Sequence, residues 1–290
     1  VGTCAVQRLV LARNKAIRNL GGSQHLPLQL QLCLTGPLAN LQVLDLSHTD
    51  AGPEMAAVLG NTLSAGHSLI ELNLNECQLG KNGTRVLCTG LQKNSTLQTL
   101  SLNANDFGAA GAHSLSLVLA TPTCGLRTLN VYGNRIDVPG AVHFCKALQV
   151  NTVLRSLDIG KNRLRKNGAA AMLQVLQVNT TLEKLLLKRN KFDDTAALSL
   201  IKTITSAPGC NVSEISLADN NLSYTTIVDA VGALKLCKRE ITFDLEERAG
   251  YLAPARLEKT AYVSPLPLNA TDEMLKRLLY SYKCGAIVNM

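Results

Sequence analysis

One apolar frame, L-x-x-L-x-L-x-x-N-x-L, recurs along most of this 290-residue chain and constrains its fold more than any other feature. Successive copies start at residues 41, 69, 97, 126, 154, 182 and 212, so the intervals are 28, 28, 29, 28, 28 and 30 residues. An earlier copy starts at Val6, and a degenerate last copy places Ile241 and Phe243 at two strand positions. A near-constant period of this length predicts stacked units that together bury one continuous core.

Each unit is predicted to contain one short strand and one helix. Residues 140–148 and 168–176 have apolar side chains three or four positions apart, which is the period of a helix with one buried stripe. Parallel strands lie about 4.8 Å apart, whereas packed helices need about 8–10 Å. Because the stack has equal numbers of both, it must curve, with the strands on the concave side and the helices on the convex side.

The repeats resemble the leucine-rich repeat family, and in particular its ribonuclease-inhibitor-like class, over residues 6–246. The resemblance implies an α/β solenoid shaped like a horseshoe. We expect residues 1–247 to form this solenoid in about eight units. The first unit departs from the pattern, because 35 residues separate Val6 from Leu41, which requires a widened loop or an insertion. Val6 enters the frame with almost no cap before it, so we expect further repeats to precede it.

The asparagine of the frame is predicted to be buried at the bend after each strand. Its amide can both donate to and accept from backbone groups that are left unpaired there. Thr49 and Cys77 replace asparagine in two early units, so the ladder is expected to be imperfect at those points. The asparagines at this position are Asn105, Asn134, Asn162, Asn190 and Asn220.

Residues 248–290 differ from the repeats and are predicted to form a C-terminal extension. Pro254, Pro265 and Pro267 indicate an extended path. Residues 271–273 then read as the start of an amphipathic helix. This helix is expected either to cap the last repeat or to dock on a partner.

Composition excludes several classes of function. Aromatic residues make up 3% of the chain and Trp is absent, which argues against recognition of single-stranded nucleic acid by base stacking. Neither G-x-G-x-x-G nor G-x-x-x-x-G-K-[ST] occurs, and the five His lie in different units without metal spacing. We therefore expect no cofactor and no metal. No uncharged stretch is apolar enough to be a convincing membrane span.

Cysteine usage favours a reducing compartment. The nine Cys are odd in number and widely spaced, without a C-x-x-C motif, which is typical of free thiols in the cytoplasm. Six Asn-x-Ser/Thr sequons are weak evidence for a secreted protein instead. Two of them, at Asn94 and Asn179, recur at one point of the repeat, so structure can explain them without glycans.

The side chains between the framework leucines are predicted to project from the concave face and to carry the function. Positions 3, 5, 7 and 8 of each frame are acidic in the early units and basic in the later ones, with Tyr132 near the middle as a candidate hot spot. Residues 154–191 contain nine Lys/Arg and two acids. The candidate partner-binding residues are Asp45, Glu71, Glu76, Tyr132, Lys161, Lys184, Lys188 and Arg189.

Stacking should gather these charges into a patch, because residues one repeat apart lie on adjacent strands. The patch is open to three interpretations: a solvated surface that keeps the protein soluble, a site for a protein partner with an acidic surface, or a site for RNA or another polyanion. The lack of stacking aromatics counts against RNA.

We predict a non-catalytic scaffold that binds a protein partner in the concave face. Asp45, Ser47 and His48 are the residue types of a nucleophilic triad, but neighbours on one strand rarely place the base between the other two groups. The resemblance further suggests a subunit of a larger intracellular assembly, such as one of the cytoskeleton or cilium. A GTPase-activating regulator and a fragment of a NOD-like-receptor-type sensor are the alternatives that it implies.

Overall fold

The computed structural model describes residues 6–13, 30, 33–34, 38–49, 51–220, 222–237 and 239–245. The predicted boundary after residue 247 and the extension over 248–290 lie outside the described residues. Most of the long connection between the first two strands also lies outside them.

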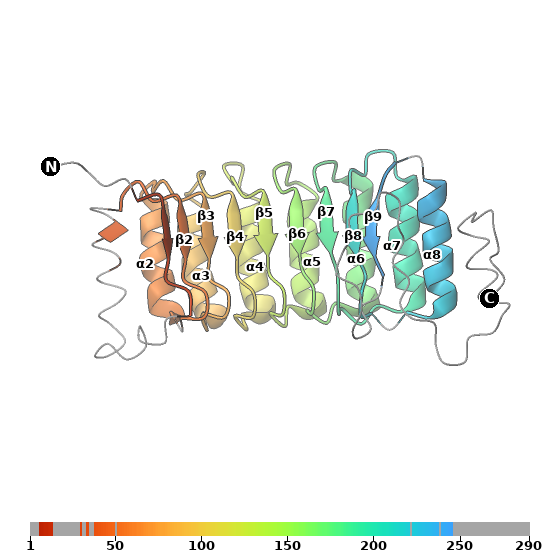
Figure 1. The fold of residues 1–290 in the computed structure, drawn as a ribbon, viewed down its shortest axis with the longest axis horizontal. Helices are drawn as coiled ribbons and strands as arrows, with labels where there is room; N and C mark the ends of the chain where they lie inside the picture. Colours follow the sequence, from red (N-terminus) through yellow and green to blue (C-terminus); the bar gives the residue numbers. More distant parts are fainter. Residues whose placement is uncertain are drawn as a thin grey trace, which may run out of the picture.

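Nine strands of the described chain form one open parallel sheet, and their order in the sheet follows their order in the sequence (Figure 1). The frame sets the register, because Leu44, Leu72, Leu100, Leu129 and Leu157 lie beside one another on successive strands. The strands are β1 (Arg8–Val10), β2 (Val43–Asp45), β3 (Glu71–Asn73), β4 (Thr99–Ser101), β5 (Thr128–Asn130), β6 (Ser156–Asp158), β7 (Lys184–Leu186), β8 (Glu214–Ser216) and β9 (Thr242–Asp244).

Helices alternate with the strands and form a second layer that covers one face of the sheet (Figure 1). In Figure 1, α8 lies beyond β9 although it precedes β9 in the chain, so the row of helices is longer than the row of strands. The expected α/β solenoid, with its strands on the shorter, concave side, is therefore confirmed. The helices are α2 (Gly52–Ser64), α3 (Gly80–Leu91), α4 (Gly108–Leu119), α5 (Asp137–Leu148), α6 (Arg165–Val178), α7 (Asp194–Ser206) and α8 (Tyr224–Leu236).

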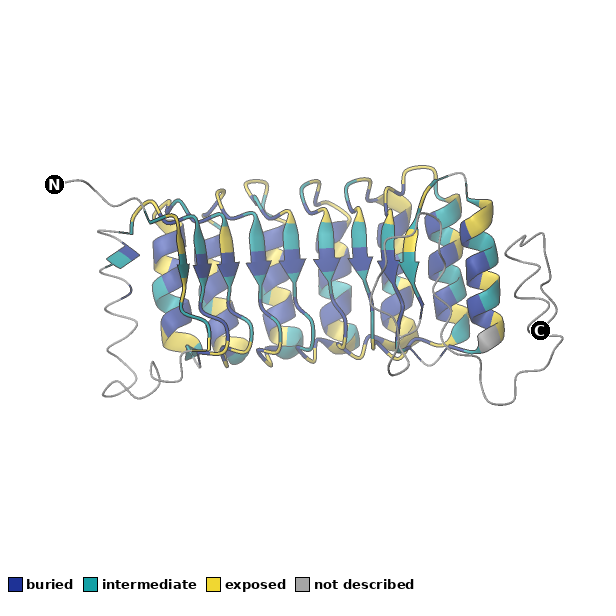
Figure 2. Cartoon of the chain, in the orientation of Figure 1, coloured by how far each residue is buried: buried dark blue, intermediate teal, exposed yellow. Residues whose placement is uncertain are grey.

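The core lies between these two layers. The central leucine of each strand from β2 to β7 is at most 1% exposed, while its neighbours on the strand face the other side (Figure 2). From the helices, Leu59, Leu87, Leu115, Phe144 and Met172 are fully buried against them. At about 25 cal/mol per Å² of apolar surface, burial of this aliphatic sandwich is the main stabilising contribution to the stack.

The asparagine ladder is buried as predicted. Oδ1 of Asn162 accepts hydrogen bonds from the backbone N–H groups of Asn134 (2.8 Å) and Ile136 (3.2 Å) in the preceding unit. Its Nδ2 donates to the carbonyl of Val131 (2.9 Å) in that unit and to the carbonyl of Ile159 (3.1 Å) in its own. Each ladder amide therefore joins two units. All five ladder asparagines are at most 1% exposed.

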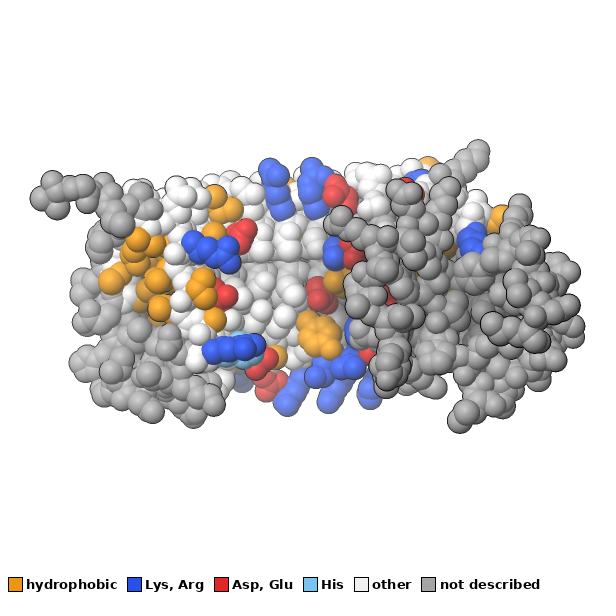
Figure 3. Space-filling model, viewed as in Figure 1, with side chains coloured by type: hydrophobic (Ala, Val, Ile, Leu, Met, Phe, Trp, Pro, Cys, Tyr) orange, Lys and Arg blue, Asp and Glu red, His pale blue; other side chains and the backbone are white. Residues whose placement is uncertain are grey.

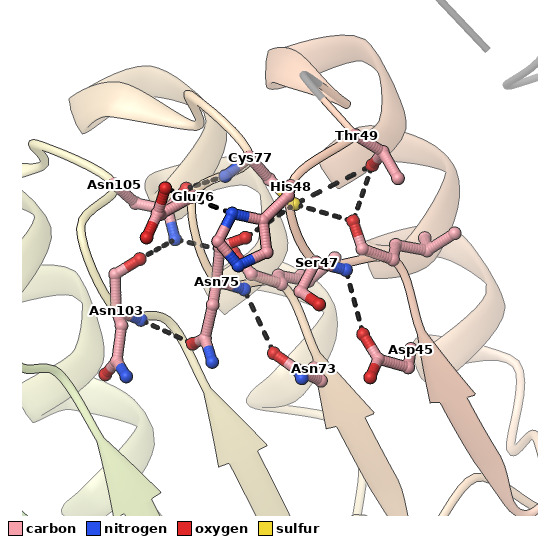
Figure 4. A network of polar contacts seen from close by, with 12 residues as sticks. Asp45, Ser47, His48, Thr49, Asn73, Asn75, Glu76, Cys77, Asn103 and Asn105 are labelled. Atoms are coloured by element: carbon pink, nitrogen blue, oxygen red, sulfur yellow. Dashed lines mark hydrogen bonds and ion pairs between the residues drawn. The ribbon is translucent and has the colours of Figure 1, made fainter. Parts of the chain in front are cut away.

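At the two early positions without asparagine, the ladder changes chemistry. The Cys77 thiol donates to the carbonyl of Leu46 at 3.0 Å, which is the acceptor that an asparagine Nδ2 would reach from there (Figure 4). The backbone N–H groups of Thr49 and Ala51 face the same sulfur, while burial, the largest cause, raises the pKa of the thiol. Sulfur is a weak donor and a weak acceptor. The ladder therefore continues through Cys77 with weaker bonds.

A second row of buried asparagines joins each helix to the next strand. Nδ2 of Asn94 donates to the carbonyl of Leu63, and its Oδ1 accepts from the backbone N–H of Leu97 at 2.9 Å. Asn151 and Asn179 make the same contacts two and three frames further along. Asn94 and Asn179, which belong to sequons, are 5% and 6% exposed and are already hydrogen-bonded. Structure therefore accounts for both sequons.

The helices begin in two different ways. α2 to α6 lack a side-chain cap. The chain enters them through left-handed residues whose N–H groups donate to carbonyls of the next unit, as Gly108 does to Asn134 at 2.9 Å. α7 and α8 are instead capped by the side chains of Asp193 and Ser223.

Two further findings concern the described residues as a whole. No helix among them is long and apolar enough to cross a membrane. The seven cysteines that they include are free thiols. Burial raises the pKa of Cys145 to about 12, so this residue acts as a small apolar core side chain and not as a nucleophile.

Candidate functional site

The structure places the predicted site residues in two groups on or beside the concave face, separated by β4. Asp45, Glu71 and Glu76 belong to the units of β2 and β3. The other five belong to the units of β5, β6 and β7. Position 8 of the frame lies in the turn after each strand and is left-handed, with φ between 53° and 60° at every described non-glycine residue there. The side chains at this position therefore project from the edge of the sheet, as those of Glu76, Lys161 and Arg189 do.

The early group does not assemble a triad. The Asp45 carboxylate accepts from the backbone N–H of Ser47 at 2.9 Å, and His48 Nδ1 lies 3.1 Å from Glu76 Oε2 (Figure 4). The histidine is thus turned to the next unit, away from Ser47. Among the described residues, no group of three or more His, Cys, Asp or Glu side chains could hold a metal ion.

Between the two groups, the concave face is polar but uncharged. The residues at positions 3, 5, 7 and 8 of the units of β4 and β5 carry no charge, and Figure 3 shows this part of the face as a white zone with charged side chains on both sides. The zone consists of Thr99, Ser101, Asn103, Ala104, Thr128, Asn130, Tyr132 and Gly133, of which Tyr132 also belongs to the later group.

Tyr132 is the centre of the later group. A Cβ atom added to Gly160 would lie 2.7 Å from Cδ2 of the Tyr132 ring, so the ring lies over the backbone of the next unit. The Lys161 ammonium lies 5.9 Å from the ring centroid, within cation–π range. The hydrogen bond with Asp219, the largest cause, and the interaction with Tyr132 raise the pKa of the Arg189 guanidinium. The ring therefore spans two repeats and is held in place from several sides.

Three of the predicted cations pair with acids of the following unit. Lys184 Nζ lies 2.6 Å from Glu214 Oε1. Lys188 Nζ and Arg189 Nε lie 3.7 Å and 2.9 Å from Asp219 Oδ2. Two acids outside residues 154–191, Glu214 and Asp219, therefore pair with three of the nine cations of that segment.

Asp158 lies in the middle of this cluster, half-buried on β6. Its Oδ1 accepts from the backbone N–H of Gly160 at 2.9 Å. Burial, the largest cause, raises the pKa of the carboxyl, although that hydrogen bond and the charges of Lys184 and Lys188 act in the opposite direction. The cluster is therefore balanced in charge but crowded.

The cations that face solvent lie along the turn edge after β6 and β7. Arg163, Arg165, Lys166 and Lys191 are exposed there, and Figure 3 shows blue side chains along the lower edge of the face. Arg135, one unit earlier, pairs with Asp106 at 3.1 Å. Net positive charge therefore gathers at the edge of the sheet more than on its concave surface.

Two features of the site were not predicted from the sequence. Glu214 and Asp219 follow Lys184 and Arg189 by 30 residues, the local repeat interval, which is the signal that could have revealed the ion pairs. The accommodation of the Tyr132 ring depends on Gly160, 28 residues further on. Both kinds of neighbour, the acids and the glycine, lie one repeat length after the candidate residue that they contact.

A curved parallel sheet that offers polar side chains on a rigid support, together with an outer row of helices, defines a repeat solenoid of the kind that binds other molecules through an extended surface. The repeats of the chain are leucine-rich repeats similar to those of the ribonuclease-inhibitor-like class. The family model described as "Leucine Rich repeat" matches residues 93–116 and 150–173.

Proteins with similar sequences carry the same repeats. Human NACHT, LRR and PYD domains-containing protein 13 is 35% identical over 116 residues, which are 40% of this chain and 11% of that protein. Leucine-rich repeat-containing protein 45 of Gallus gallus is 31% identical over 113 residues, covering 38% of this chain and 17% of the relative. Ribonuclease inhibitor of Sus scrofa is 32% identical over 140 residues, covering 44% and 31%. The chain thus matches less than a third of the length of each of these relatives.

A solved structure shares the fold. The leucine-rich repeat-containing protein LegL7 from Legionella pneumophila superposes with a TM-score of 0.54 and 16% sequence identity, covering 82% of each chain. At this identity, the likeness extends to the fold alone.

Proposed function

We propose that this protein is a non-catalytic scaffold that holds a protein partner in its concave face. The observation that carries the proposal is the Tyr132 cluster, because an aromatic ring fixed by Gly160, Lys161 and Arg189 is ordered before a partner arrives. Binding then loses little side-chain entropy at this point. Tyr and Arg are also the residue types that dominate binding energy at interfaces.

The partner is proposed to be dipolar along the solenoid, with an acidic surface toward the later repeats. Lys161 and the edge cations Arg163 and Lys191 would face its acidic part. Asp45 and Glu71 would face a basic part near β2 and β3. Lys184, Lys188 and Arg189 contribute mainly by positioning, since each is already paired with an acid.

Substitutions in the cluster test this proposal. Truncation of Tyr132→Ala should weaken partner binding about thirtyfold, the effect of losing one hot spot of about 2 kcal/mol. Leu117→Ala, which truncates an exposed apolar residue on the helical side, is the control and should not change binding. The measurement is titration calorimetry with a partner obtained by affinity capture with the wild-type chain. Equal affinities for wild type and Tyr132→Ala would remove this cluster from the binding site.

Charge swaps test the electrostatic part without breaking internal pairs. Replacing Lys184, Lys188 and Arg189 by Glu would place carboxylates beside Glu214 and Asp219. The resulting repulsion would destabilise the fold, so a loss of binding could not be assigned to the partner contact. The double variant Lys184→Glu with Glu214→Lys keeps the internal pair but inverts the pattern that a partner meets. It should slow association, with the difference shrinking as salt rises. Association rates that do not change at any salt concentration would contradict an acidic partner surface.

We further propose that the protein acts in the cytoplasm as a subunit of a larger assembly, such as one of the cytoskeleton or cilium, with residues 248–290 as a cap or a docking element. Similarity to repeat proteins many times longer than the matched segment supports a role within a larger architecture. Truncation before Arg248 separates the two roles of the extension. Unfolding of the shortened chain would indicate a cap, whereas a folded chain that loses its partner would indicate docking. Imaging of the tagged protein in cells tests its location.

A sensor-type protein is the second candidate. Its supporting observation is the 35% identity to a protein whose name includes NACHT, LRR and PYD domains. Immunoprecipitation with an antibody to the repeats should then recover a chain that also contains a nucleotide-binding module. Recovery of a chain with repeats alone would exclude it. A GTPase-activating role is tested by stimulated hydrolysis of GTP with small GTPases, and unchanged hydrolysis would exclude it.

A further inference from the structure

The concave face carries a row of side-chain amides whose acceptor atoms are already in use. Oδ1 of Asn73 accepts from the backbone N–H of Asn75 at 3.1 Å, and Oδ1 of Asn75 accepts from the backbone N–H of Asn103 at 2.8 Å (Figure 4). Oδ1 of Asn130 accepts from the backbone N–H of Tyr132 at 3.2 Å. Since a backbone N–H can only donate, these bonds fix each amide with its oxygen toward the protein.

The nitrogen of each fixed amide is consequently free to donate. Within the described part of the chain, no hydrogen bond engages Nδ2 of Asn73, Asn75 or Asn130. These residues are half-buried, so part of each side chain stays accessible from the concave face. The row offers hydrogen-bond donors without matching acceptors, and it therefore suits a ligand that is rich in acceptors.

Asn103 lies beside this row and differs from its members. Its Oδ1 atom is buried and has no hydrogen-bond partner among the described residues. A buried acceptor left unpaired costs about 1–3 kcal/mol. A water that donates to this oxygen would recover that loss.

The spacing of the row selects the conformation of the ligand. Asn73 and Asn130 occupy the same frame position two strands apart, and two parallel strands span about 9.6 Å. A polyproline II helix rises about 3.1 Å per residue with three residues per turn, so every third carbonyl faces the same side at about 9.3 Å. Its carbonyls make no internal hydrogen bonds and are available to donors. A β-strand has a side-chain and carbonyl repeat of two residues, about 6.6 Å, and does not match.

We propose that Asn73, Asn75 and Asn130 bind the main-chain carbonyls of an extended partner segment in polyproline II conformation, which crosses the strands from β2 toward β6. This inference rests on the proposed function and names the part of the partner that is recognised. The three amides bind the backbone of the partner segment, while Asp45 and Glu71 bind a basic side chain at one end of it. Lys161 receives an acidic side chain at the other end.

The sequence itself supplies the substitutions for the test. Asn73→Asp and Asn130→Asp keep the oxygen that accepts the backbone N–H but remove both Nδ2 donors. Aspartate is compatible with this position, because Asp45 and Asp158 make the same bond in their own units. Asn82→Asp, at an exposed position on helix α3, adds the same charge on the opposite layer and is the matched control.

The experiment selects linear peptides from a phage-displayed random library on the full chain and measures the affinity of the enriched peptides by calorimetry. The expected result is that Asn73→Asp combined with Asn130→Asp weakens binding about tenfold or more, since donors to carbonyls are lost and a repulsive charge is gained. Asn82→Asp should leave the affinity unchanged. Proline should be tolerated along the peptide, because recognition uses carbonyls and requires no peptide N–H.

Three results would overturn the proposal. The first is that no linear peptide is enriched. The second is equal loss of affinity in Asn82→Asp and in the concave-face variants. The third is intolerance of proline, which indicates pairing in a β-strand. If a partner still depends on Tyr132 in any of these cases, the scaffold function stands without the amide row. If neither peptide nor partner depends on any concave-face residue, both proposals fail.

Discussion

The early and the later repeats of this solenoid are held to their neighbours by different contacts. Between α2 and α3 the backbones touch, because a Cβ atom on Gly90 would overlap the carbonyl of Gly60. At the same level the ladder is weakened, with Thr49 and Cys77 in place of asparagine. From β4 onward the asparagine ladder is complete, and from β7 to β8 ion pairs are added on the concave face.

This difference shows that one curved stack can be stabilised from either side. The close approach of α2 and α3 lies in the same units in which the ladder lacks asparagine. Between α4 and α5, where the ladder is complete, a Cβ atom on Gly140 would lie 3.0 Å from Ala112 Cβ and 3.2 Å from Ala109 Cα, so these helices pack closely without the overlap found at Gly90. The following predictions test this division of contacts, beginning with the largest expected effect.

Gly90→Ala should lower the free energy of unfolding by about 3 kcal/mol or more, because the new methyl group meets backbone atoms that cannot rotate away. Gly232→Ala, in helix α8, is the matched control, since nothing lies within 4 Å of its added Cβ. That change should raise stability by about 0.5–1 kcal/mol through helix propensity. Urea denaturation followed by circular dichroism measures both. Similar effects of the two substitutions would contradict close packing between α2 and α3.

Asn162→Ala should cost about 3 kcal/mol, because it leaves several buried backbone groups unpaired in two units. Cys77→Ala should cost about 1 kcal/mol, since sulfur makes weaker bonds at the same ladder position. The same denaturation measurement applies, with exposed Asn82→Ala as a control expected to have little effect. A loss in Cys77→Ala as large as that in Asn162→Ala would show that the thiol is equivalent to an amide.

Asp219→Asn should cost about 1 kcal/mol at low salt and less at high salt, because it breaks a partly buried contact with Lys188 and Arg189. The Asp219 side chain is 18% exposed, whereas that of Glu76, which pairs with His48, is 57% exposed. Glu76→Gln should therefore have little effect at neutral pH. Thermal melts at two salt concentrations distinguish the variants. A salt-independent loss in Asp219→Asn would mean that packing, not charge, is responsible.

Acidification should have opposite effects on the two regions. Burial, the largest cause, lowers the pKa of His67, whose Nδ1 accepts from the Leu69 N–H. The folded protein therefore binds this proton less well, and the contribution of His67 is present above pH 6.5 and is lost as pH falls below it. His67→Gln should reduce that loss between pH 7 and about pH 5.

Asp158 shows the reverse behaviour, because its pKa is raised above 3.8. Its charge opposes folding at neutral pH, so its contribution is most favourable below pH 3.8 and declines as pH rises through the folded-state pKa. Asp158→Asn, which keeps the acceptor for the Gly160 N–H, should match or slightly exceed the wild-type stability at neutral pH and lose this advantage in acid. Stability curves against pH test both residues. If the stability curves of the wild type and a variant run parallel, the substituted residue does not contribute to the pH dependence of stability.

The repeat period predicted the strand order, the helical layer and the buried asparagines residue by residue. It also identified the weak ladder positions at Thr49 and Cys77, because a missing residue type is visible in an aligned frame. The contact between Gly60 and Gly90 was not predicted. A glycine in a helical stripe reads only as a small residue, and the approach of two backbones depends on the relative rotation of their helices.

The positions of the candidate site residues on the sheet follow from the sequence, and their role in binding stays a prediction. Tyr132, Lys184 and Arg189 were selected because the frame identifies the exposed positions of each strand. Their environment was not predicted, since Asp219 lies in the next unit and Gly160 is inconspicuous in sequence. The donor row was also missed, because a free asparagine nitrogen is apparent only when the bond that holds its oxygen is known.

The sequence by itself determined that this chain stacks strand and helix units into a curved solenoid, because the spacing of apolar residues dictates which side chains must leave water together. Only the tertiary structure decided which charges cancel and which amide groups still lack partners. Those outcomes depend on distances of a few ångströms between neighbouring repeats, and hydrogen bonds and ion pairs change steeply over such distances, whereas apolar burial does not.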